Sequence, residues 1–134
     1  FQLDIPAEKV IKGKQIGNYV NEIFPLGDFD DRYKVKKIIG KGSYGYVAKA
    51  VRKSDNSFVA IKKIVNLFQS LPETRRILRE IVLLKNCKHP NIVRMIEVLI
   101  PKSQTIDNFD HIYLITEFCD SDLQKVFKSD NIFF

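Results

Sequence analysis

The segment from Tyr33 to Ile64 alternates strand-like runs with tight turns, and this pattern constrains the fold more than any other feature of the chain. Runs rich in β-branched and aromatic residues cover Tyr33 to Ile39, Tyr46 to Val51 and Phe58 to Ile64. Glycines separate the first two runs, and Ser54-Asp55-Asn56-Ser57 separates the last two. Because short turns join only antiparallel neighbours, the segment predicts a three-stranded antiparallel meander.

A helix is predicted directly after the third run. Ser70 and Glu73 have the spacing of a capping box, in which the serine side chain accepts a hydrogen bond from the third helical N–H. Pro72 suits the first turn, where a missing N–H costs little. The helix is expected to run to about Asn86, since Cys87-Lys88-His89-Pro90 ends it.

Two more strand-like runs and a short helix complete the predicted elements. The strands are expected at Ile92 to Ile100 and at His111 to Phe118, joined by a polar loop, and the helix at about Ser121 to Lys128. The sequence therefore predicts the α+β class, with a five-stranded antiparallel sheet and one main helix packed on it.

Residues 1–30 are interpreted as an N-terminal extension. Apolar side chains alternate there with glycines and prolines, which interrupt any regular element. We expect this extension to pack on another surface. An acidic cluster ending at Asp31 separates it from the strands, so residues 31–134 are predicted to form the folded lobe.

Composition narrows the function classes. The chain of 134 residues is 45% hydrophobic, which is enough for a packed core. Its net charge of +6 arises from 22 basic and 16 acidic residues that are interleaved, without a face of basic and aromatic side chains, so a nucleic-acid partner is not expected. No apolar run is long enough to cross a bilayer, which predicts a soluble protein without a membrane partner.

Cysteine and histidine usage predicts no metal site in this chain. Cys87 and Cys119 lack metal-ligand spacing and are expected to be free buried thiols in a reducing compartment, the cytoplasm or the nucleus. His89 and His111 have no cysteine or carboxylate at metal-ligand spacing. His89 is expected to cap a turn.

The turn between the first two predicted strands reads Gly40-Lys41-Gly42-Ser43-Tyr44-Gly45-Tyr46-Val47. Glycines allow a backbone to approach a polyphosphate and to direct its N–H groups at it. A dinucleotide-binding fold uses the same glycine spacing but leads into a helix, whereas Tyr46 to Val51 has the composition of a strand. A flap over phosphates fits better, and on the loop alone an ordinary glycine hairpin is an equal alternative.

A lysine lies among residues suited to a core, at the end of Val59-Ala60-Ile61-Lys62. Strand alternation puts Phe58, Ala60 and Lys62 on one face, and Val59, Ile61 and Lys63 on the other. Lys62 would then face the cleft beneath the flap, where its ammonium can reach phosphates. The alternative is a solvated lysine near a strand end.

The predicted helix carries a carboxylate within an apolar stripe. Glu80 falls between Leu83 and Leu84 on the helical wheel, and the stripe is completed by Ile77, Leu78, Ile81 and Val82. A buried ionised carboxylate needs a cation partner, and Lys62 on the preceding strand is the expected one. The alternative is an exposed Glu80 paired with Arg76 one turn earlier.

In their order and spacing, these features resemble the small lobe of a eukaryotic Ser/Thr protein kinase. The matching motifs are the glycine loop, Val59-Ala60-Ile61-Lys62, Arg79-Glu80-Ile81 and His89-Pro90-Asn91-Ile92-Val93. The resemblance covers about Tyr33 to Lys128. The segment from Phe68 to Ile81 and the polar insert before Asp110 are similar to mitogen-activated protein kinases in particular, and cyclin-dependent kinases are the next nearest family.

The resemblance implies a role for each matching position at the phosphate end of an ATP site. Lys62 would hold the phosphates and pair with Glu80. The flap residues would cover the phosphates: Gly40, Gly42, Ser43 and Gly45.

The resemblance likewise implies the adenine end. Thr116 would be the gatekeeper, the Glu117 carbonyl and the Cys119 N–H would bond the adenine edge, and Asp122 would lie near the ribose. The apolar roof would consist of Ile39, Val47 and Ala60.

As a kinase lobe, the chain would work with Mg²⁺ and ATP, protein substrates and an upstream activating kinase. The magnesium ligands and the catalytic aspartate of such kinases have no counterpart in this sequence, so the 134 residues alone are expected to bind ATP weakly and to show no phosphotransfer. An alternative from a different class is a kinase-like lobe serving as a non-catalytic docking or scaffold module. The apolar residues of 1–30 favour that alternative, whereas the Lys62 and Glu80 pair argues against it.

Overall fold

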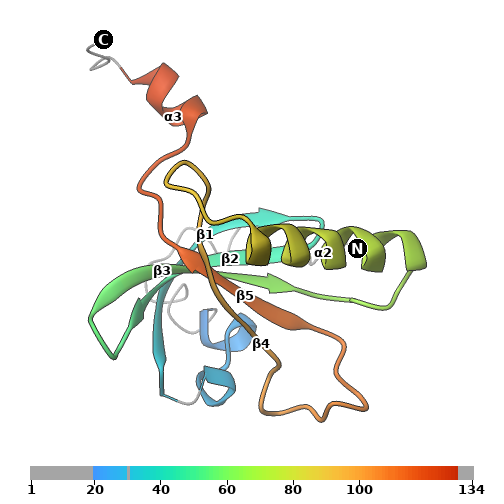
Figure 1. Ribbon diagram of the computed structural model, residues 1–134. Helices are drawn as coiled ribbons and strands as arrows, with labels where there is room; N and C mark the ends of the chain where they lie inside the picture. The colour runs from blue at the N-terminus through green and yellow to red at the C-terminus, as the bar shows by residue number, and fades with distance from the viewer. Residues whose placement is uncertain (1–19, 30, 130–134) are drawn as a thin grey trace.

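The computed structural model describes residues 20–29 and 31–129 (Figure 1). Most of the predicted N-terminal extension, residues 1–19, and the last residues, 130–134, lie outside the described residues. The predicted boundary at Asp31 stays a prediction.

Five antiparallel strands form one sheet, as the sequence predicts. Its spatial order is β1-β2-β3-β5-β4, so the first three strands are the expected meander. The strands are β1 (Tyr33–Gly42), β2 (Gly45–Arg52), β3 (Ser57–Ile64), β4 (Met95–Leu99) and β5 (Ile112–Glu117).

Strand β4 is shorter than the predicted run from Ile92 to Ile100. The chain is still turning at its start, because the Ile92 N–H donates to the His89 carbonyl at 3.1 Å. The Asn91 N–H donates to His89 Nδ1 at 3.1 Å, which confirms that His89 caps a turn. Pairing with β5 therefore begins only at Met95.

The main helix, α2 (Leu71–Asn86), begins and ends where the sequence predicts. Ser70 is its N-cap and accepts a hydrogen bond from the Glu73 N–H at 3.4 Å. The Cys87 N–H closes the last turn by donating to the Leu83 carbonyl at 2.9 Å. Helix α3 (Leu123–Lys128) follows the sheet and extends away from it (Figure 1).

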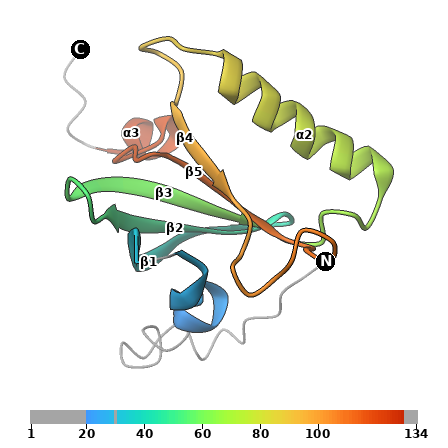
Figure 2. The same ribbon diagram turned by 60° about the horizontal axis from the view of Figure 1, so that its bottom comes forward.

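The two faces of the sheet bury two separate cores, and Figure 2 shows the helical segments that cover them from opposite sides. Alternation along β3 divides its residues between the faces, as predicted. One core contains Val59, Ile61, Tyr46, Tyr113 and Ile115 together with Phe24 and Phe29. The other contains Ile64, Leu67, Ile112 and Leu114, with Ile77, Ile81 and Leu84 of α2 partly buried against it.

A short helical segment, residues 20–29, seals the first core. Residues 20–23 are helical and are followed by the 3₁₀ turn η2 (Leu26–Phe29). Asp28 is 4% exposed and accepts hydrogen bonds from the Tyr113 hydroxyl at 2.7 Å and the Ser103 hydroxyl at 3.0 Å. Lys63 Nζ donates to the Ile23 carbonyl at 2.6 Å. These bonds tie the segment to β3 and β5.

Burial shifts the pKa values of two of these side chains, Tyr113 and Lys63. Burial and the hydrogen bond to Asp28 raise the pKa of Tyr113 well above its usual range. Burial lowers the pKa of Lys63, and the nearby carboxylates Asp28 and Asp110 oppose that effect.

Among the described residues, no helix is long and apolar enough to cross a membrane.

We predict that Tyr113→Phe destabilises the fold by about 1–3 kcal/mol, because it leaves the buried Asp28 carboxylate without its main donor. Urea unfolding measures this change. Ser103→Ala is the matched control and should cost less than about 1 kcal/mol, since Ser103 is exposed and water can replace its hydroxyl. Equal losses in the two variants would contradict this account of the segment.

Candidate nucleotide-binding site

The glycine flap is a strand–turn–strand hairpin and does not lead into a helix. Gly40 pairs with Val47 and Gly42 with Gly45, so Ser43 and Tyr44 form the tip. This arrangement excludes the dinucleotide-binding alternative. Gly45 has φ of 139°, and a Cβ there would lie 2.2 Å from the Lys63 carbonyl oxygen, so no other residue fits at this position.

Lys62 and Glu80 meet beneath the flap. Lys62 lies on β3 opposite Val47 of β2 and Leu114 of β5. Its Nζ is 2.9 Å from Glu80 Oε1, which joins the middle of the sheet to the middle of α2. The side chains are 23% and 42% exposed, so the pair is only partly buried.

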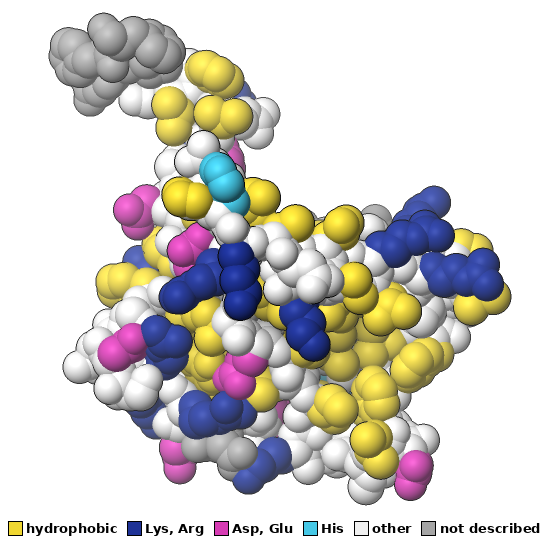
Figure 3. Space-filling view, in the orientation of Figure 1, with side chains coloured by type: hydrophobic (Ala, Val, Ile, Leu, Met, Phe, Trp, Pro, Cys, Tyr) yellow, Lys and Arg dark blue, Asp and Glu magenta, His cyan; other side chains and the backbone are white. Residues whose placement is uncertain are grey.

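The prediction that Glu80 lies within a buried apolar face was wrong. None of the residues of α2 is buried. Its apolar residues span too wide an arc to contact one sheet face, so three of them remain in solvent: Leu78 at 59%, Val82 at 47% and Leu83 at 62% exposure. Figure 3 shows such apolar side chains on the outer surface of the molecule. Attraction between charges, rather than relief of burial, therefore holds Glu80 to Lys62.

The residues expected over the adenine gather along the cleft face of β1 to β3. Ile39 is 43% exposed, while Val47 and Ala60 are half-buried. A hollow of about 500 Å³ opens there. Its lining includes Ile39, Gly40, Val47, Lys49, Phe118, Cys119 and Asp122.

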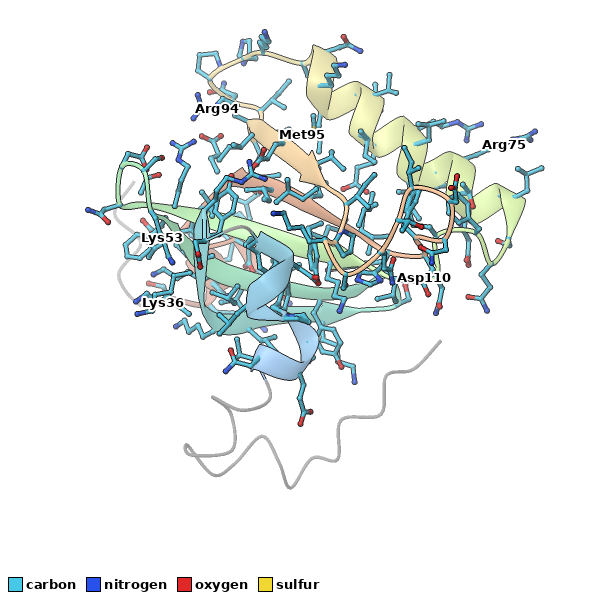
Figure 4. The ribbon with its side chains drawn as sticks, turned by 90° about the horizontal axis from the view of Figure 1, so that it is seen from below. Lys36, Lys53, Arg75, Arg94, Met95 and Asp110 are labelled. Carbon is cyan, nitrogen blue, oxygen red and sulfur yellow. The ribbon has the colours of Figure 1, made fainter. Side chains whose placement is uncertain are left out.

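Hydrogen bonds to Arg94, which directly precedes the neighbouring strand β4, fix the end of β5. The Glu117 N–H donates to the Arg94 carbonyl at 3.0 Å, and the Arg94 N–H donates to Glu117 Oε1 at 2.8 Å. Arg94 and Met95 lie at the start of β4 in Figure 4. Thr116 is half-buried and pairs with Ala60 and Met95. The Glu117 side chain is therefore held against the backbone at the start of β4.

The two residues expected beyond Glu117 lie on the surface. Cys119 is a free thiol and exposed, and Cys87 is free and partly exposed, so the expectation of buried thiols was wrong. The chain leaves the sheet after Glu117, and no second layer covers Cys119 in the described residues. Asp122 is the N-cap of α3 and accepts a hydrogen bond from the Lys125 N–H at 2.8 Å.

Sequence reasoning missed three cation–aromatic contacts at the site, two made by Lys49 and one by Lys62. Lys49 Nζ lies 4.1 Å from the ring centre of Phe58 and 4.6 Å from that of Phe118. Lys62 Nζ lies 4.4 Å from the ring centre of Tyr44. Strand alternation could have found Lys49, which shares the cleft face with Val47, but no sequence signal gives the orientation of Tyr44.

The structure thus assembles two groups of the predicted residues. Lys62, Glu80 and the flap form one end, and the hollow beside Cys119 forms the other. In residues 20–29 and 31–129, no three histidine, cysteine, aspartate or glutamate side chains converge to hold a metal ion. The roles of these residues toward a nucleotide stay predictions.

Comparison with known sequences decides the family. A family model described as the protein kinase domain matches residues 33–134, which is more than half of the chain. The chain belongs to the protein kinase family. The five-stranded sheet with one main helix is the small-lobe fold that the resemblance implied, and the match is to the N-terminal part of the domain.

Mitogen-activated protein kinases are among the relatives of this kinase-family chain. It is 44% identical over 101 residues to Mitogen-activated protein kinase 8 of Oryza sativa subsp. japonica, which covers 75% of the chain and 17% of that protein. It is 43% identical over 100 residues to Mitogen-activated protein kinase 9 of Arabidopsis thaliana, which covers 75% of the chain and 19% of that protein. The chain therefore spans less than a fifth of these curated relatives.

We predict that Glu80→Gln changes the free energy of unfolding by less than about 1 kcal/mol, because the ion pair that it breaks is partly exposed. Urea unfolding at low and moderate salt measures the effect, which should shrink as salt screens the pair. A loss of several kcal/mol would mean that Glu80 is buried and would contradict the exposure described here.

Proposed function

We propose that this chain is the ATP-binding lobe of a Ser/Thr protein kinase, in which the complete enzyme transfers the γ-phosphoryl group of Mg-ATP to protein hydroxyls. One observation carries the proposal, namely the contact of Lys62 Nζ with Glu80 beneath a three-glycine flap. Glu80 fixes the position of an ammonium that would contact the phosphates of a nucleotide bound beneath the flap.

Each group has a separate part in this proposal. The flap backbone offers N–H groups to the phosphates, and Lys62 neutralises part of their charge. At the other end, Ile39, Val47 and Ala60 give apolar contact to the adenine ring. The Glu117 carbonyl and the Cys119 N–H would bond the adenine edge, and Asp122 would lie near the ribose.

Magnesium would lower the charge of the phosphates, and its protein ligands are not expected among the residues of this chain. Protein substrates and an upstream activating kinase are further expectations of the family. The relatives compared above are mitogen-activated protein kinases.

The scaffold alternative loses part of its support in residues 20–29, the described part of the extension. The apolar side chains of residues 20–29 were expected to be available to a partner, but Val20, Phe24 and Phe29 are buried in the chain's own sheet. Among the described residues, the exposed apolar side chains of α2 favour it. A scaffold has no need for an ion pair beneath a glycine flap, so the kinase proposal is preferred.

Nucleotide binding tests the proposal. We expect the magnesium complex of AMP-PNP, a non-hydrolysable ATP analogue, to bind the chain weakly, and Lys62→Met to reduce the affinity about ten- to hundredfold through loss of a charge-assisted contact. Isothermal titration calorimetry measures both. Lys53→Met is the matched control, since Lys53 lies at the distant β2–β3 turn (Figure 4) and pairs only loosely, at 3.8 Å, with Asp31. Equal losses in the two variants would contradict the assignment of Lys62.

A second experiment tests the prediction that the 134 residues alone do not catalyse phosphotransfer. The 134 residues alone should transfer no phosphate from radiolabelled ATP to a generic protein substrate such as myelin basic protein, because the groups that orient the acceptor hydroxyl and bind magnesium are not in this sequence. Transfer that survives purification and disappears in Lys62→Met would contradict the prediction.

A further inference from the structure

The side chain of Tyr44 adds an aromatic contact with Lys62 to the glycine flap. Its ring lies at the flap tip, with its centre 4.4 Å from Lys62 Nζ. An ammonium over an aromatic face at this distance is attracted by the electron-rich ring. The same ammonium contacts Glu80 at 2.9 Å. Lys62 is therefore engaged from two directions, by a carboxylate of α2 and by a ring of the flap.

Gly42 accommodates this position of the ring. A Cβ on Gly42 would lie 2.5 Å from Tyr44 Cε1, 2.9 Å from Cζ and 3.0 Å from Cδ1. Such distances are shorter than side chains tolerate, so the ring rests directly against the α-carbon of Gly42. The missing side chain at residue 42 is used by Tyr44 in this conformation, and not only by an approaching phosphate.

We propose that Tyr44 sets the nucleotide affinity of this site, because its ring covers the Lys62 ammonium in the ligand-free chain and must leave before a phosphate can contact it. This inference rests on the proposed function. The ring and a phosphate oxygen would compete for the part of the Lys62 ammonium that Glu80 does not contact. A state in which the site is covered lowers the apparent affinity by the fraction of molecules in that state.

A hollow next to the flap has room for the Tyr44 ring once it leaves Lys62. A hollow of about 230 Å³ lies between the flap and the beginning of α2, and Tyr44 lines it together with Ser43, Gln69, Glu73 and Arg76. Tyr44 is also 36% exposed, so the ring is not fixed in a core. It can therefore leave Lys62 without disturbing either of the two cores of the sheet.

Two substitutions separate the ring from the hydroxyl. Tyr44→Phe keeps the aromatic face over Lys62 and should bind magnesium AMP-PNP within about twofold of the unmodified chain. Tyr44→Leu keeps an apolar side chain, although a shorter one, and removes the aromatic face. It should bind the analogue roughly two- to thirtyfold more tightly, the range that corresponds to the strength of cation–aromatic contacts.

A measurement without nucleotide tests the contact itself. The ε-CH₂ protons of Lys62 should be shifted upfield by the ring in NMR spectra of the unmodified chain and of Tyr44→Phe, and should return toward ordinary lysine values in Tyr44→Leu. Addition of magnesium AMP-PNP to the unmodified chain should remove the same shift, because the phosphates displace the ring.

The outcomes distinguish this inference from the proposed function. Measurable binding that is equal or weaker in Tyr44→Leu overturns the inference and leaves the proposed function standing. So does the absence of a ring-induced shift at Lys62. If none of the three proteins binds the analogue while all show folded spectra, the proposed function fails and the inference fails with it.

Discussion

The contact between Lys62 and Glu80 is the interaction on which the architecture of the site depends. It joins β3, in the centre of the sheet, to a helix that buries none of its residues completely. The apolar side chains by which helix α2 rests on the sheet, Ile77, Ile81 and Leu84, are only partly buried. A helix held so lightly can shift, and a charge pair across the gap favours one position without locking it.

Neighbouring lysines of β3 show how the sheet separates function from stability. Lys62 projects into the cleft and contacts Glu80, whereas Lys63 projects to the opposite face and donates to the Ile23 carbonyl. On that face, the Tyr113 hydroxyl and the buried Asp28 carboxylate fasten residues 20–29 to the sheet. The strand that presents the ammonium is thus supported from behind by a segment that precedes the family match.

Much of the fold followed from local rules. Strand alternation assigned Lys62 and Lys63 to opposite faces, and the cap at Ser70 placed the helix start. Burial was harder to predict, because the helical wheel shows that Glu80 has apolar neighbours but not how much of that arc meets the sheet. The contact of the Tyr44 ring with Lys62 and the hydrogen bond between Asp28 and Tyr113 could not be predicted either, since both join segments that are distant in the sequence.

A double-mutant cycle on nucleotide affinity tests most directly whether Lys62 and Glu80 act as one unit. The dissociation constant of magnesium AMP-PNP would be measured for the unmodified chain, Lys62→Met, Glu80→Gln and the double variant. If Glu80 acts by holding the ammonium in place, Glu80→Gln weakens binding in the unmodified chain and has no further effect once Lys62 is methionine. A loss by the same factor in both backgrounds would contradict the account, because Glu80 would then act without Lys62.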